Sequence, residues 1–78
     1  MPKLPVVSGK ETIKALQKIG FEAMNQEGSH IKLARKVGSV TQKVIVPNHK
    51  QIKRGTLRSG ILRAIGLSVE EFVKLLGR

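Results

Sequence analysis

Alternation of apolar and polar side chains in the middle of the chain constrains the fold more than any other feature of the sequence. In the segment His30–Lys36, Ile31 and Leu33 fall on one face of an extended strand, and the side chains between them fall on the other. Gly38 then marks a turn, and the segment Thr41–Val46 that follows is rich in β-branched residues and is ended by a proline. The pattern predicts two antiparallel strands at the centre of the fold.

A helix and one more strand are predicted before these two strands. Ser8 and Glu11 have the spacing of a capping box, in which two side chains satisfy free backbone amides at the start of a helix. We expect this helix to continue to about Lys18. Phe21–Asn25 is a plausible short strand, which would complete a three-stranded antiparallel meander.

Two further helices are predicted after the last strand. The first should begin between Lys53 and Thr56 and end at Gly66, and Gly60 inside it should cost about 1 kcal/mol relative to alanine. Ser68 opens a second capping-box match and a last short helix. The apolar positions of the second helix are Leu57, Ile61, Leu62 and Ile65. The resulting order, α-β-β-β-α-α, belongs to the α+β class.

Length and composition point to one small domain. At 78 residues the chain is near the lower limit for an unaided core, and it has no cysteine for a disulfide or a thiolate zinc site. Phe21 and Phe72 are its only aromatic residues, so the core must be mostly aliphatic. No apolar run approaches the roughly 20 residues that span a bilayer, and the proline-broken segment Met1–Val7 is too short for a signal peptide. We expect a soluble, cytoplasmic protein in which residues 1–78 form a single domain.

The charge of the chain favours nucleic acid as a partner. Fifteen lysine and arginine residues face five acidic ones, which gives a formal net charge of +10. Every acidic residue lies outside the segment 28–69, which holds both histidines. Such a field attracts polyanions and speeds encounter with them, although a merely solvated basic surface is the alternative. Without Tyr or Trp to stack on bases, recognition of backbone and shape is favoured over the reading of bases.

The turn Gly28-Ser29-His30 contains the best candidate for a catalytic side chain. With two histidines and no cysteine, the chain has few groups that move protons near neutral pH. His30 shares a strand face with Lys32 at a Cα separation of about 6.5 Å, and a neutral imidazole there could take a proton from an RNA 2′-hydroxyl. That oxygen would attack the adjacent phosphorus while nearby cations stabilise the developing charge. Taken alone, the tripeptide is short and common, so a turn histidine without a catalytic task is the simpler interpretation.

Basic residues on either side of this strand are candidates for binding RNA. Lys10 begins a row of lysines spaced four apart on the first helix, and a second patch leads into the second helix. His49 is either a solvated loop residue or a second acid–base or phosphate-contacting group. The residues expected to contact RNA are Lys10, Ser29, Lys32, His49, Lys50, Lys53, Arg54 and Arg58. Two histidines without cysteine or a neighbouring carboxylate make a poor metal site, and no Walker or GxGxxG loop is present, so we expect neither metal nor cofactor.

Five short segments, spread over the chain, together resemble the motifs of one protein family. They are Leu4–Glu11, Gly28-Ser29-His30, Val46–His49, Gly55–Arg58 and Gly66–Phe72. Taken in order, they resemble the HicA family, the toxin half of HicA–HicB toxin–antitoxin pairs. Their order and spacing are more specific than any one of them. Gly60 looks like an extra residue relative to the usual family pattern, which leaves the register of the second helix open.

The resemblance implies a fold and an activity. The fold is like the double-stranded-RNA-binding domain, α-β-β-β-α with an extra short C-terminal helix and with helices on one face of a three-stranded antiparallel sheet. The activity is that of a ribonuclease that cleaves mRNA, with an essential histidine corresponding to His30. The expected partner is a HicB-type antitoxin that covers the active surface.

Three hypotheses follow from the sequence. The first is a type II toxin that acts as a metal-independent endoribonuclease on single-stranded or loosely structured mRNA, with His30 as the general base, or as the base and then the acid. The second is a non-catalytic, basic RNA-binding module of the same fold. The third is an interaction domain whose positive surface docks an acidic protein. We expect no membrane partner under any of them.

Overall fold

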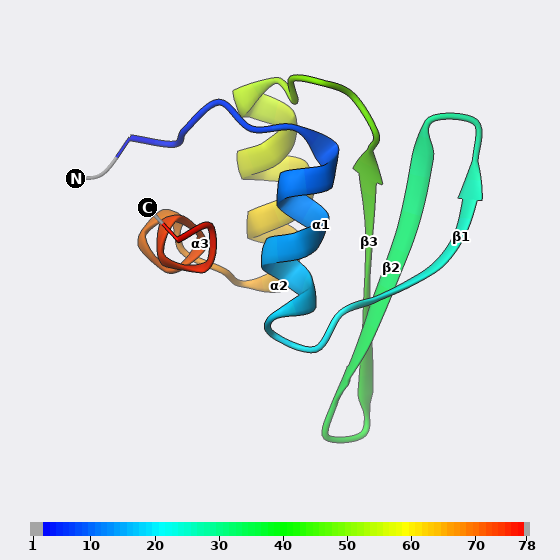
Figure 1. Ribbon diagram of the computed structural model, residues 1–78. Helices are drawn as coiled ribbons and strands as arrows, with labels where there is room; N and C mark the ends of the chain where they lie inside the picture. Colours follow the sequence, from blue (N-terminus) through cyan, green and yellow to red (C-terminus); the bar gives the residue numbers. More distant parts are fainter. Residues whose placement is uncertain (1–2, 78) are drawn as a thin grey trace.

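The computed structural model describes residues 3–77 and has the α+β architecture that the sequence predicts (Figure 1). The elements, in chain order, are α1 Gly9–Gln17, β1 Glu22–Glu27, β2 His30–Val37, β3 Val40–Pro47, the π-helix η1 Thr56–Leu62, α2 Arg63–Ile65 and α3 Val69–Leu75. This is the α-β-β-β-α order of a double-stranded-RNA-binding-domain-like fold, followed by a short C-terminal helix. Within residues 3–77, no helix has the length and apolar character needed to cross a membrane.

The three strands form an antiparallel meander with β2 in the centre. Both connections are two-residue turns that begin with a glycine, Gly28 at a φ of 58° and Gly38 at a φ of 62°, a region that glycine enters without steric cost. The predicted strands β2 and β3 are confirmed. The prediction for β1 was partly wrong, because its ladder continues through Glu27 to the turn, whereas Phe21 lies before the strand and is buried in the core.

β1 is an edge strand that carries a β-bulge. The register pairs Ala23 with Leu33 and Asn25 with Lys32, so Met24 has no cross-strand partner. All residues of β1 are exposed. The strand is therefore held by its hydrogen bonds to β2 rather than by burial, and the bulge changes which of its side chains face each side of the sheet.

Helices cover one face of the sheet and leave the other open. Leu33, Val44 and Val46 are buried, whereas their neighbours Lys32 and Ile45 are exposed, as the alternation of a strand requires. Figure 1 shows α1, the second helix and α3 gathered on one side of the sheet. The core they enclose consists of Leu4, Val7, Ala15, Leu16, Phe21, Leu33, Val44, Val46, Ile52, Leu57, Ile61, Leu62, Ile65 and Phe72.

The second helix is not the regular α-helix that the sequence predicts. Helical residues begin at Arg54 and end before Gly66, within the predicted limits. The segment Thr56–Leu62 is nevertheless π-helical, and the Arg63 N–H donates to the Arg58 carbonyl five residues earlier. The four apolar side chains assigned to this helix are all buried, as predicted.

The π-helical segment includes Gly60 and keeps the apolar face of the helix. A π-helical turn closes its hydrogen bond over one more residue than an α-helical turn does. Leu57 and Ile65, on opposite sides of Gly60, are both buried.

Local side-chain hydrogen bonds fix the helix ends. At α1 the Glu11 N–H donates to the Ser8 hydroxyl and the Ser8 N–H donates to the Glu11 carboxylate, each at 3.1 Å, so the predicted capping box is confirmed. At α3 the Glu71 N–H donates to the Ser68 hydroxyl at 3.1 Å. α1 ends at Gln17, one residue earlier than expected.

Two basic side chains hold elements of the fold together. The Arg35 side chain donates Nε to Gln42 at 2.7 Å and Nη1 to a backbone carbonyl just after α1 at 2.9 Å, and it lies 4.8 Å from the centre of the Phe21 ring. The Lys18 Nζ donates to the Leu75 carbonyl at 2.6 Å and so joins α1 to α3. Arg35 and Lys18 therefore have structural roles in the fold.

Substitution of Gly60 by alanine should stabilise the protein. Gly60 is exposed, its φ is outside the left-handed region, and an added Cβ would meet no atom closer than 3.9 Å. Alanine restricts the unfolded chain without strain in the native one, so the free energy of unfolding should rise by about 0.5–1 kcal/mol. Urea denaturation measures the change. Gly66→Ala is the matched control and should destabilise, because Gly66 has a φ of 70°.

Candidate active site

One end of the sheet brings together three segments that are far apart in the chain. His30 at the start of β2 lies opposite Pro47 at the end of β3. The Asn48 N–H donates to the Ser29 carbonyl at 2.6 Å, and the Gly9 N–H donates to the His49 carbonyl at 2.8 Å. Figure 1 shows the start of α1, the β1–β2 turn and the end of β3 at the same end of the molecule, where the second helix also begins. The motifs in these segments thus lie together at one end of the sheet.

The absence of a side chain at Gly9 allows the close approach of α1 to this end of the sheet. Gly9 is buried, and a Cβ there would collide with the Pro47 carbonyl oxygen and lie 2.8 Å from the Asn48 Cα. Separations as short as these essentially never occur, so the backbone would have to move. Gly9 therefore sets the distance between the first turn of α1 and the loop that contains His49.

His30 is exposed and lines a hollow on the open face of the sheet. The hollow has a volume of about 290 Å³. Lys32 lies on the same strand face and lines the same hollow, so the predicted juxtaposition with His30 is present. The residues that line it are Asn25, Glu27, His30, Lys32 and Ile45. An imidazole and an ammonium group beside one small cavity are the elements that acid–base chemistry on a phosphate requires.

Glu27 is a neighbour of His30 that the sequence reasoning missed. The prediction that the histidines lack a neighbouring carboxylate was wrong, because the register pairs Glu27 with His30 across the two-residue turn. The signal was present in the spacing Glu27-Gly28-Ser29-His30, since a two-residue hairpin makes positions i and i+3 cross-strand partners. The predicted strand ended at Asn25, whereas β1 continues through Glu27.

The loop after β3 folds towards the start of β2. The sequence left the role of His49 open. The hydrogen bond from the Asn48 N–H to the Ser29 carbonyl brings the backbone of its loop next to the residue before His30. The His49 side chain is exposed, and its carbonyl accepts the hydrogen bond from Gly9. Lys10 is exposed in the same first turn of α1. Ser29, His30, His49 and Lys10 thus lie on connected segments.

The second basic patch is only partly assembled with His30. Lys50, Lys53 and Arg54 are exposed in the loop and at the start of the second helix, which begins at the His30 end of the molecule (Figure 1). Arg58, in contrast, lines a separate hollow between η1 and α3, together with Arg63. The structure therefore divides the predicted set, with Arg58 apart from the rest.

The described residues contain no ready metal centre. Over residues 3–77, no three His, Cys, Asp or Glu side chains lie close enough together to hold a metal ion. His30 and Glu27 are the two such side chains that share the hollow. Together with Lys32, they offer proton transfer and cationic stabilisation as the chemistry of the site.

The fold and this end of the sheet define a class of small, basic α+β proteins with an exposed histidine beside a cavity. The chain belongs to the HicA family: the family model described as the HicA toxin of bacterial toxin–antitoxin matches residues 9–67. The match covers α1, the sheet and the second helix, and it confirms the resemblance seen in the sequence. No curated protein and no solved structure matched the chain. The protein is thus a toxin of a toxin–antitoxin system, and membership of that family implies an antitoxin partner.

Substitution of Gly9 by alanine should destabilise the protein. The added Cβ overlaps the backbone of residues 47 and 48, and overpacking of this kind costs about 1–3 kcal/mol. Urea denaturation measures the loss. Gly55→Ala is the matched control, because a Cβ at Gly55 meets nothing within 4 Å. Equal stability of the two variants would contradict a tight contact between α1 and the end of β3.

Proposed function

We propose that the protein is a metal-independent endoribonuclease toxin that cleaves single-stranded or loosely structured mRNA. The observation that carries the proposal is the position of His30, exposed at the start of β2 and beside a cavity that it shares with Lys32. The formal charge of +10 supports a polyanionic substrate. Membership of a toxin family supports a damaging activity in the cell.

The proposed reaction is an internal displacement at phosphorus. The neutral His30 imidazole removes the proton from the 2′-hydroxyl, and the 2′ oxygen forms a bond to the adjacent phosphorus. The bond from phosphorus to the 5′ oxygen breaks, and that oxygen takes up a proton, from the protonated His30 or from water, as it leaves. The products are a 2′,3′-cyclic phosphate and a 5′-hydroxyl. Lys32 offers positive charge where the phosphoryl oxygens become more negative.

Glu27 supports His30 in this proposal. A general base is commonly oriented by a third group that accepts a hydrogen bond from it, and the Glu27 carboxylate lines the same hollow as His30. Glu27 would thus be a positioning residue, whereas His30 is the residue that touches the reacting atoms. His49, on the loop bonded to Ser29, would contact a phosphate at the same end.

The basic segments around the site would bind the RNA backbone. Lys10, Ser29, Lys50, Lys53 and Arg54 lie on segments that meet at the His30 end of the molecule. Arg58 would contact the RNA further along, because it lines the hollow between η1 and α3. We further propose that residues 1–78 act as one cytoplasmic RNA-cleaving domain and that a HicB-type antitoxin neutralises it.

Replacement of His30 by alanine should abolish cleavage without loss of the fold. General acid–base catalysis contributes about 10²–10⁴-fold, so the rate on a labelled single-stranded RNA should fall by about that factor in EDTA. Glu27→Gln should lower the rate less, because it removes an orienting group and keeps the base. Circular dichroism checks folding of each variant.

Other results of this experiment would point elsewhere. Undiminished cleavage by His30→Ala would remove His30 from the mechanism. Cleavage that EDTA abolishes and a divalent ion restores would contradict a metal-independent reaction. If folded wild type binds RNA but cuts none, the rival hypothesis of a non-catalytic RNA-binding module holds. An RNA with a 2′-deoxy nucleotide at the cut position should resist cleavage, because the attacking hydroxyl is missing.

Replacement of a lysine or arginine that binds a phosphate should lower the affinity for RNA. It should also make that affinity less dependent on salt concentration. Each lysine or arginine that neutralises a phosphate of single-stranded RNA adds about 0.7 to the slope of log K against log salt, so its removal should reduce the slope by that amount. We expect this for Lys50→Ala, Lys53→Ala and Arg54→Ala in fluorescence anisotropy titrations. Lys74→Ala is the matched control, because it removes the same charge from an exposed position in α3. A slope change as large in Lys74→Ala would show that total charge, not position, governs binding.

A further inference from the structure

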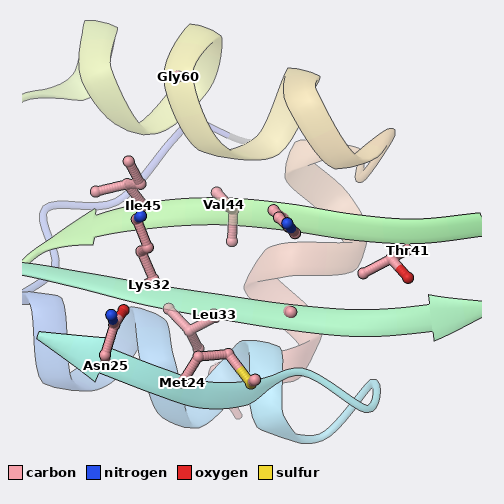
Figure 2. Close-up of a pocket in the computed structure, with 10 residues that line it drawn as sticks. Met24, Asn25, Lys32, Leu33, Thr41, Val44, Ile45 and Gly60 are labelled. Carbon is pink, nitrogen blue, oxygen red and sulfur yellow. The ribbon is translucent and has the colours of Figure 1, made fainter.

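The open face of the sheet contains a second and larger hollow. Its volume is about 720 Å³. Figure 2 shows side chains from all three strands around it, with Gly60 of η1 beyond the edge of β3. The residues that line it are Met24, Asn25, Lys32, Leu33, Ala34, Thr41, Lys43, Val44, Ile45 and Gly60.

This hollow is continuous with the one beside His30. Asn25, Lys32 and Ile45 line both. His30 and Lys32 occupy alternate positions on β2 and face the same side, so a chain lying in the large hollow can reach the imidazole without leaving the face of the sheet. Any ligand bound there would be held against the proposed catalytic group.

The hollow combines exposed apolar side chains with lysines. Met24 and Ile45 expose 66% and 50% of their surfaces. Lys32 lies opposite Ile45 and Ala34 lies opposite Lys43, and all of them line the hollow. A surface of this kind matches a ligand that combines a flat apolar ring with an anion.

The β-bulge contributes directly to this arrangement. In the pairing of β1 with β2, Met24 is the residue without a cross-strand partner, and the next residue, Asn25, lies opposite Lys32. Bulges are often found beside functional sites, where they redirect side chains. The π-helical segment contributes Gly60 to the lining, beyond the edge of β3 (Figure 2). Two irregularities of the backbone thus meet at one cavity.

We propose that this hollow binds the base of an unpaired nucleotide next to the scissile phosphate. The inference rests on the proposed ribonuclease function and names its substrate more closely. The base would lie against Met24 and Ile45, the Asn25 amide would hydrogen-bond to its edge, and the neighbouring phosphates would lie near Lys32 and Lys43. A base inside a duplex is stacked and paired, so it cannot enter. The site therefore selects single-stranded RNA by its need for a free base rather than by aromatic stacking.

The distribution of charge favours RNA over an acidic protein segment as the occupant. The lysines of the open face lie on β2 and β3, whereas Glu22 and Glu27 lie on β1. An anionic backbone can follow the lysines while its base projects towards Met24. An acidic peptide strand paired with the free edge of β1 would meet these two glutamates.

Paired variants test the proposal by RNA binding. The double variant Met24→Gln, Ile45→Thr replaces two exposed apolar side chains of the hollow by polar ones and keeps a β-branched residue in β3. The probe is an eight-nucleotide 2′-fluoro RNA, which has no attacking hydroxyl, either single-stranded or annealed to its complement. The variant should bind the single strand about tenfold more weakly and the duplex as wild type does. Val40→Thr is the matched control, because Val40 is exposed by 61% at the far end of β3, and it should change both affinities less than twofold.

The Met24 methyl group provides a second readout. Both aromatic side chains of the protein, Phe21 and Phe72, are buried in the core, so a ring-current shift at Met24 would come from a bound base. With methyl-labelled methionine, the Met24 resonance should move upfield with the single-stranded probe and stay in place with an abasic oligomer of the same length. The resonance is assigned by its loss in Met24→Leu.

Defined results would overturn the proposal. If wild type and the double variant bind the single strand with equal affinity, the open face does not bind a base. It would then face the antitoxin or solvent. An equal Met24 shift with the abasic oligomer would show that the face binds an anion without a base. These results are independent of cleavage, because the probe cannot be cut. Failure of His30 as the general base and failure of the base site are therefore separate outcomes.

Discussion

The close packing of α1 against the end of β3 is the contact on which the rest of the structure depends. Gly9 lets the two backbones approach, and its N–H and the Asn48 N–H tie α1, the loop after β3 and the β1–β2 turn into one unit. Without this contact, His30 would stand at the tip of a hairpin whose β1 arm is exposed throughout. The candidate site is therefore built by tertiary contacts between loops, while the sheet only sets the direction of its side chains.

Elements with a strong local signal could be predicted from the sequence. The alternation from His30 onwards sets the face of every side chain in β2, so the shared face of His30 and Lys32 followed from it. The capping box at Ser8 and Glu11 is a matter of spacing within four residues, and it formed as expected. In both cases the physical cause lies within a few residues of the chain, where sequence patterns are informative.

Features that depend on pairing or packing between distant segments were missed. The partnership of Glu27 with His30 depends on the number of residues in the turn, and the bulge at Met24 depends on how β1 fits β2. The segment Thr56–Leu62 is π-helical, although its apolar residues would also share one face of a regular α-helix. Apolar spacing does not distinguish the two geometries, so a regular helix was predicted.

The one-sided sheet links these irregularities to function. A chain this short has enough apolar side chains to cover one face of three strands, and its two aromatic residues are both used in that core. The opposite face can therefore carry exposed Met24 and Ile45 beside lysines at little cost to stability, since neither side chain belongs to the core. The bulge and the π-helix disturb the backbone at the edges of that face. In this fold the packed face provides stability, which leaves the open face free to be shaped for a ligand.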